Sequence, residues 1–237
     1  MHTESIGYDV AGTHYVGYLA NDPTRTERRP GILICHEGNG LGPQVKERAH
    51  RLAALGYVAF AVDYVGNGEV LKDMPSMMAR LGALRGNLDL VRSLARAGLG
   101  VLISRPEVDP KRIAATGYCF GGTFALELAR SGAQLACVVG FHCGLETTRP
   151  EDAKHITGKI LVCIGADDPL IPPPQRLAFE AEMRAENVDW RLNLYGGAVH
   201  GFANPNAGAL GNPAVAYNEH ADKRSWRAML DLFEEAL

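Results

Sequence analysis

The strongest chemical signal in the chain is the segment Gly117-Tyr118-Cys119-Phe120-Gly121-Gly122. It directly follows a strand-like run, RIAAT, and it opens a helix-like run, FGGTFALELAR. The pattern G-x-nucleophile-x-G at a strand-to-helix turn allows a bend too tight for larger side chains and exposes the nucleophile above the sheet. Cys119 is therefore a candidate nucleophile. The alternative interpretation is a glycine-rich turn around a buried structural cysteine.

The position of Cys119 at the start of the predicted helix bears on its reactivity. The helix dipole and the amides of a first turn favour thiolate over thiol. The backbone amide of Phe120 points to the same place, so it is a candidate donor of an oxyanion hole. The loop at 36–41, after the strand-like run GILIC, normally provides the second donor. In that loop Glu37 either holds the thiol proton in the resting state or is a solvated residue of an ordinary turn.

A nucleophile of this kind needs a base, and the base needs an orienting group. On such a turn the usual chain order is nucleophile, acid, histidine. The strand-like run at 159–165 ends in Asp167 and Asp168, and the carboxyl ends of parallel strands face the site crevice. Either Asp is a candidate acid, and either could instead serve a turn or a helix cap. His200 follows the next strand-like run, where the third member is due, although a lone loop histidine is otherwise a bystander.

Two acids, two histidines and a cysteine are also the residue types of a metal site. These residues come from separate predicted strands, without a CxxC or HxxxH pair. Metal ligands normally show such close spacing. We therefore expect no metal.

The intervening segments alternate between two kinds of element. Short runs that are apolar on both faces predict buried strands of a parallel sheet, at 31–35, 57–62, 113–117, 135–141, 160–164 and 191–195. Longer segments between them predict helices, at 45–55, 76–102, 120–130, 174–186 and 214–236. This alternation predicts a single α/β domain over 1–237, with a mostly parallel sheet and helices on both faces. The opening segment 5–20 alternates like a pair of antiparallel edge strands, and 21–30 reads as an exposed connection.

The bulk properties exclude several classes of protein. A chain of 237 residues with 46% hydrophobic and 22% charged residues is ordinary for a globular protein. Its net charge of -3 provides no basic surface for nucleic acid. The five cysteines show no disulfide framework, and no segment resembles a signal peptide or a membrane span, so we expect a cytoplasmic protein. The sequence assigns no oligomeric state.

Four segments in order, HEGNGL, GYCFGG, GADDPLIP and YGGAVHGF, resemble the dienelactone hydrolase family of the α/β-hydrolases. They are spread over most of the chain. The resemblance implies an α/β-hydrolase fold with little or no cap domain, no metal or organic cofactor, and a small-molecule ester or lactone as substrate. It implies a Cys-His-Asp triad in which Asp168, rather than Asp167, is the acid.

The resemblance also assigns supporting roles. Glu37 matches the family residue that contacts the nucleophile before substrate arrives, and Gly38 and Phe120 match the residues whose amides form the oxyanion hole. His142 falls where the family places aromatic residues that line the site. Family members that act on dienelactone carry an Arg at the position of Asn204, so dienelactone is a doubtful substrate here.

A second substrate-binding Arg of the family comes from the segment before the nucleophile's helix. Arg80, Arg85 and Arg92 are the candidates in this chain, of which Arg80 is the first choice. Because the thiolate of Cys119 is itself a good leaving group, the tetrahedral intermediate reverts to substrate unless the other leaving group departs as easily. A cysteine nucleophile therefore favours enol lactones, aryl esters and thioesters over alkyl esters. Two other functions use the same residues. One is a non-catalytic or thiol-sensing binding protein on a hydrolase fold, and the other is an acyltransferase.

Overall fold

The computed structural model describes the whole chain, residues 1–237, except for the side chains of Ala209 and Leu210. It contains two compact units, Met1–Ala115 and Thr116–Leu237. The two units are described separately below. The single domain expected over 1–237 stays a prediction.

The first unit opens with an antiparallel hairpin of β1 (His2–Val10) and β2 (Thr13–Asn21). Ala11 and Gly12 join the strands with φ angles of 50° and 80°. Positive φ at both turn residues suits the right-handed twist of a two-residue hairpin. The antiparallel pair predicted at 5–20 is thus confirmed.

The rest of the first unit combines parallel strands with helices. The strand order is β1-β2-β4-β3, with β5 next, and it includes β3 (Arg29–Cys35), β4 (Val58–Val62) and β5 (Val108–Tyr118). Strands β3 and β4 are parallel, and every residue of β4 is buried. Helix α1 (Pro43–Ala54) packs on β2, β3 and β4, and α3 (Leu88–Ile103) packs on β1, β3 and β4. This packing explains why β3 and β4 are apolar on both faces.

The long helix predicted at 76–102 is wrong. The chain forms two helices there, α2 (Met74–Arg85) and α3, separated at Gly86 and Asn87. The side chain of Asn87 accepts a hydrogen bond from the amide of Leu90 at 3.0 Å, so Asn87 caps a new helix instead of continuing the old one.

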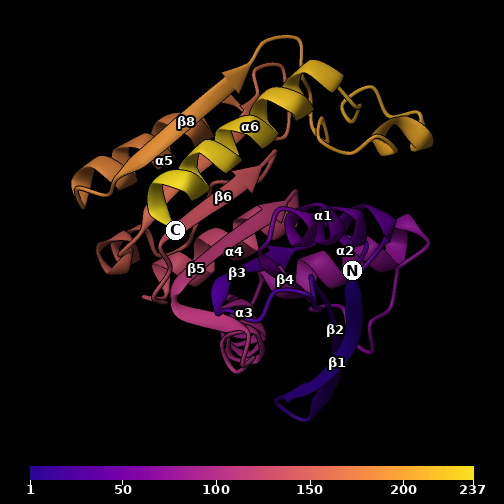
Figure 1. Cartoon of the computed structure of the whole chain (residues 1–237). Helices are drawn as coiled ribbons and strands as arrows, with labels where there is room; N and C mark the ends of the chain where they lie inside the picture. The colour runs from indigo at the N-terminus through magenta and orange to yellow at the C-terminus, as the bar shows by residue number, and fades with distance from the viewer. The chain divides into compact units, whose positions relative to one another are not determined.

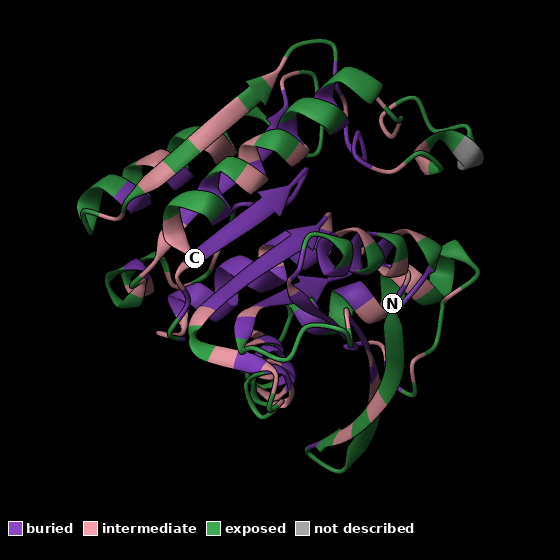
Figure 2. Ribbon diagram, in the orientation of Figure 1, coloured by how far each residue is buried: buried purple, intermediate pink, exposed green. Residues whose placement is uncertain are grey.

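The second unit has the parallel strands β6 (Cys137–Phe141), β7 (Lys159–Gly165) and β8 (Trp190–Tyr195), in that order. Strands β6 and β8 are labelled in Figure 1. Its helices are α4 (Phe120–Arg130), α5 (Pro173–Ala185) and α6 (Glu219–Ala236), with short 3-10 turns η1 (Pro150–His155) and η2 (Ala207–Leu210). Helix α4 packs on β6, and α6 packs on β6 and β7. Figure 2 shows that β6 is buried along its length, whereas the edge strand β8 is partly exposed. The predicted mostly parallel sheet covered by helices is confirmed.

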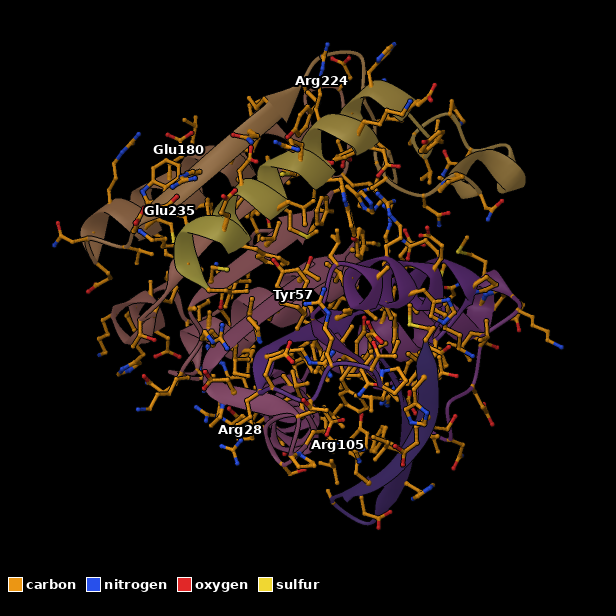
Figure 3. All side chains as sticks on the ribbon, viewed as in Figure 1. Arg28, Tyr57, Arg105, Glu180, Arg224 and Glu235 are labelled. Atoms are coloured by element: carbon orange, nitrogen blue, oxygen red, sulfur yellow. The ribbon has the colours of Figure 1, made fainter. Side chains whose placement is uncertain are left out.

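The last helix starts later than the predicted segment 214–236. Asn218 accepts a hydrogen bond from the amide of Ala221 at 3.0 Å and caps α6 at Glu219. Near the other end of α6, Glu235, labelled in Figure 3, pairs with Arg191 of β8 and with Lys159 of β7. Among the described residues, no helix has the length and apolar character that crossing a bilayer requires.

Candidate active site

Cys119 lies at the sharp turn between β5 and α4, as the sequence pattern predicts. Its backbone is in an unusual conformation, with φ 55° and ψ −124°. Non-glycine residues at positive φ are uncommon and are enriched at functional sites. Its amide donates to the carbonyl of Phe141 at the end of β6, at 3.0 Å. Its side chain is partly exposed.

The glycines of this turn are required by close contacts. A Cβ atom on Gly117 would lie 2.0 Å from the carbonyl oxygen of Gly121. A Cβ atom on Gly122 would lie 2.4 Å from the Cβ of Cys143. Both distances are far below contact distance, so larger residues would force the turn open. The sequence therefore fixes the position of Cys119 through residues that have no side chain.

The structure brings the three predicted residues of the triad together. The Nε2 atom of His200 lies 3.2 Å from the Sγ atom of Cys119. The Nδ1 atom of His200 lies 2.9 Å from Oδ2 of Asp168. Because a carboxylate only accepts hydrogen bonds, Nδ1 carries a proton and donates it. The other oxygen of Asp168, Oδ1, accepts from the amide of Leu170 at 2.8 Å, which fixes the carboxylate in the turn after β7.

The neighbouring Asp167 contacts the backbone instead of the histidine. Its carboxylate accepts from the amide of Gly197 at 2.9 Å, and its own amide donates to the carbonyl of Ala198 at 3.1 Å. Asp167 thereby ties the turn after β7 to the turn after β8. The end of β7 comes so close to this turn that a Cβ on Gly165 would lie 2.3 Å from the carbonyl oxygen of Ala198.

The environment of His200 changes its protonation. Burial of the ring disfavours its charge, but hydrogen bonds to Asp168 and Cys119, together with the negative charges of both partners, outweigh burial. The net result raises the pKa of His200 to about 10. These contacts favour the protonated ring, in which both nitrogens can donate.

The backbone around His200 is held by a segment that the sequence reading missed. The amide of His200 donates to the carbonyl of Ala214 at 3.2 Å, and the amide of Ala216 donates back to the carbonyl of His200 at 3.0 Å. The amide of Asn218 then donates to the carbonyl of Phe202 at 3.1 Å. The helix predicted at 214–236 includes residues 214–217, which are not helical in the structure. Pro213 before it and the helix-capping residue Asn218 after it are the signals that mark this segment as extended.

His142 lies next to this group, directly after β6. It is fully buried, and its ring centre lies 5.3 Å from that of His200, with the planes inclined at 68°. The ring of His142 therefore contacts the ring of His200 and is shielded from solvent. The substrate-binding role that the resemblance implied for His142 stays a prediction.

The other predicted site residues have the following surroundings. Phe120 is the first residue of α4, where backbone amides have no carbonyl partner within the helix. Glu37 and Gly38 lie in the first unit, in the loop after β3. A Cβ on Gly38 would lie 2.8 Å from a methyl of Leu81 and 3.3 Å from the sulfur of Met77, so α2 covers this loop.

The two predicted substrate-binding polar residues both make local hydrogen bonds. Arg80 donates through its Nε atom to the carbonyl of Tyr64 at 2.9 Å. The side chain of Asn204 accepts from the amide of Asn206 at 2.9 Å, which closes a turn after His200. In the described part of the chain, no group of three or more His, Cys, Asp or Glu side chains is arranged to hold a metal.

The other cysteines differ from Cys119 in their surroundings. All five are free thiols, and only Cys119 is not buried. Burial raises the pKa of Cys137 and Cys163 to about 12 and the pKa of Cys35 and Cys143 still further. These four cysteines act as small apolar residues of the core, as buried free cysteines commonly do.

Comparison with known proteins identifies relatives along almost the whole chain. The model of the dienelactone hydrolase family matches residues 16–237. The solved protein m3DLH is 44% identical, with a TM-score of 0.97 over 100% of this chain and 98% of that one. A dienelactone hydrolase-like promiscuous phosphotriesterase from metagenomic libraries is 40% identical, with a TM-score of 0.95 over 99% of this chain and 98% of that one.

A relative from Bradyrhizobium sp, described as a probable 2-oxo-3-(5-oxofuran-2-ylidene)propanoate lactonase, is 29% identical over 85% of this chain and 86% of its own length. The family model covers far more than half of the chain, and the structural matches share its α/β-hydrolase fold. The fold that the four segments implied is therefore confirmed, and the chain belongs to the dienelactone hydrolase family of hydrolases.

Proposed function

We propose that the protein hydrolyses an activated carboxylic ester, an enol lactone or a thioester through a thioacyl-enzyme intermediate. Cys119 is the nucleophile, His200 the acid and base, and Asp168 the residue that orients His200. One observation carries this proposal. A continuous series of hydrogen bonds, 2.9 Å and 3.2 Å long, joins Asp168, His200 and the one thiol that is not buried.

The reactive form would be a thiolate beside an imidazolium, because the hydrogen bonds and negative charges of its partners raise the pKa of His200. The Sγ atom of Cys119 attacks the carbonyl carbon, and the carbonyl electrons move to oxygen. The amides of Phe120 and Gly38 are the proposed donors to that oxyanion, each contributing roughly 2.7–4 kcal/mol. His200 then donates its Nε2 proton to the leaving oxygen or sulfur.

The second half of the proposed reaction is hydrolysis of the thioacyl-enzyme, with His200 as the base. Acylation removes the negative charge of Cys119, which is one of the causes that raise the pKa of His200. The pKa of His200 then falls, so the neutral ring can take a proton from water. The hydroxide formed attacks the thioester carbonyl, and the acid is released together with the thiolate of Cys119.

Glu37 keeps its proposed role as the residue that contacts the thiol before substrate arrives. A carboxylate near the sulfur disfavours the thiolate by like-charge repulsion. Such protection has a purpose, because an exposed thiolate is readily oxidised. A bound substrate would then displace Glu37 or change its contacts before attack.

The substrate is proposed to be a neutral ester rather than dienelactone. Arg80 already donates to the carbonyl of Tyr64, and Asn204 is a neutral residue engaged in a turn. Neither side chain therefore supplies a ready bidentate partner for a substrate carboxylate. We further propose a cytoplasmic location, which the five free thiols support because cysteines stay reduced there.

The test is hydrolysis of 4-nitrophenyl acetate, phenyl thioacetate and an enol lactone by the wild type and by Cys119→Ala. We expect turnover by the wild type only, and a mass increase of one acyl group on the peptide that contains Cys119 after rapid quenching. Turnover by Cys119→Ala equal to that of the wild type would disprove the proposed nucleophile. Absence of turnover on every substrate would favour the thiol-sensing alternative, and acyl transfer to an added alcohol instead of water would favour the acyltransferase.

Phosphotriester hydrolysis is a second candidate, favoured by the relative that carries this description at 40% identity. A thiolate attacks phosphorus as it attacks carbon, with the same oxyanion donors. Release of 4-nitrophenol from diethyl 4-nitrophenyl phosphate, with loss of the signal in Cys119→Ala, tests it directly.

A further inference from the structure

His142 stands at a position that the backbone tolerates poorly. It is the first residue after β6, and its φ angle is 38°, in the region that favours glycine. Such a conformation persists only where the surroundings enforce it, and it is enriched at functional sites. The amide of His142 donates to the carbonyl of Cys163 in β7 at 2.8 Å, which holds the strained residue against the neighbouring strand.

The segment that follows His142 is anchored to buried polar groups. Arg130 is completely buried and donates to both carboxylate oxygens of Glu182, at 2.7 and 2.8 Å. The same guanidinium donates to the carbonyl of Leu145 at 3.0 Å. The amide of Leu145 donates to the side chain of Gln175 at 2.9 Å. Helices α4 and α5 therefore fix the path of the chain just beyond His142.

The ring of His142 meets two rings of the loop after β8. Its centre lies 5.3 Å from that of His200 and 5.1 Å from that of Phe202, with plane angles of 68° and 82°. These are edge-to-face arrangements at the distances typical of aromatic pairs. The ring centre of Tyr118, at the end of β5, lies 6.1 Å from that of His142, so rings from two parts of the chain surround His142.

The plane of the His200 ring is set by hydrogen bonds and by packing. Its two nitrogens, which flank the same ring carbon, lie 2.9 Å from Oδ2 of Asp168 and 3.2 Å from Sγ of Cys119. Both hydrogen bonds can bend, so the ring can still tilt by small rotations about the Cα–Cβ and Cβ–Cγ bonds of His200. The edge-to-face contact with His142 resists such a tilt.

We propose that His142 is a positioning residue whose ring, held by the strained turn after β6, fixes the plane of His200 for proton transfer to and from Cys119. The proposal rests on the proposed hydrolase function. In this proposal the planar shape of the His142 ring positions His200, and the ring nitrogens of His142 are not required. Ionisable groups around this pair include Cys119 and Asp168 at His200, Tyr118 at His142, and Cys143, the residue directly after His142.

The test compares His142→Phe, which keeps a planar ring of similar size, with His142→Ala, which removes it. We expect kcat for 4-nitrophenyl acetate to fall roughly 10- to 100-fold in His142→Ala with KM unchanged, because misplaced catalytic groups lose rate in this range. In His142→Phe we expect kcat within about threefold of the wild type, since ring contact is retained. KM stays constant because a buried ring does not touch the substrate.

Phe179→Leu is the matched control, because Phe179 makes a buried edge-to-face contact with Trp190 at 6.1 Å on α5 and β8, away from His200. It should lower stability without changing kcat. The alkylation rate of Cys119 by iodoacetamide as a function of pH gives a second readout. His142→Ala should change this profile, and both His142→Phe and Phe179→Leu should leave it unchanged.

Three results would overturn the proposal. If His142→Phe loses as much activity as His142→Ala, the nitrogens matter and not the ring. If His142→Ala keeps its kcat and its alkylation profile, the contact has no positioning role. If KM rises while kcat stays constant, His142 binds substrate. Lack of ester turnover by the wild type would reject the proposed function alone, because the alkylation profile still reports on how His142 positions His200.

Discussion

Replacement of Asp168 by Asn removes one charge from the site while keeping the size of the side chain. In the wild type the pKa of His200 is raised from 6.5 to about 10 against the opposing effect of burial, which corresponds to about 5 kcal/mol in favour of the imidazolium. Asp168 and Cys119 both contribute through a hydrogen bond and a charge. If Asp168 supplies half, its loss weakens proton binding by His200 about 50-fold.

In Asp168→Asn the pKa of His200 should be lower than in the wild type. Burial still lowers the pKa of His200 in Asp168→Asn, whereas one of the two opposing partners has lost its charge. His200 therefore loses its proton at a lower pH than in the wild type. Because the imidazolium then stabilises the negative sulfur less, the alkylation rate of Cys119 should fall. Ester turnover should fall by roughly 10²- to 10⁴-fold, because a wrongly oriented or wrongly protonated base has that cost in comparable triads.

The assay measures iodoacetamide alkylation of Cys119 from pH 5 to 10, together with turnover of 4-nitrophenyl acetate. Asp167→Asn is the matched control, because Asp167 accepts from the amide of Gly197 and an Asn oxygen can still accept this bond. It should change turnover only slightly. Equal losses in both variants, or an unchanged alkylation profile in Asp168→Asn, would refute the assignment of Asp168 and the electrostatic reasoning behind it.

Three further predictions concern other parts of the chain. Limiting iodoacetamide should label Cys119 before the four buried cysteines, whose pKa values burial raises, and peptide mapping that finds another cysteine first would contradict this. Arg130→Met should destabilise the fold by roughly 3–5 kcal/mol in urea unfolding, because it leaves Glu182 buried without its cation; a loss under 1 kcal/mol would show that water replaces the pair. Glu37→Gln should speed alkylation of Cys119 in the free enzyme, and unchanged kinetics would retire its protective role.

Much of the fold and the candidate site could be read from local sequence. The alternation of apolar runs and helical segments predicted the covered parallel sheet, because a strand buried on both faces must be apolar throughout. The turn at Cys119 was visible because it depends on glycines at fixed spacing, and clashes such as the one at Gly117 act within six residues. Asn87 shows where such reading failed. Its capping side chain divides a segment whose overall apolar character suggested one helix.

The sequence by itself thus determined which residue types follow which strands, and the order of Cys119, Asp168 and His200 along the chain. It left Asp167 and Asp168 equivalent until a family resemblance was considered, because adjacent residues share the same local signals. In the tertiary structure the two differ physically, because one carboxylate accepts from a backbone amide and the other faces His200. The contact between His142 and His200 was likewise decided in three dimensions, since it joins loops after two different strands. Hydrogen bonds and ring contacts act over a few ångströms, and only folding brings residues 58 positions apart within that range.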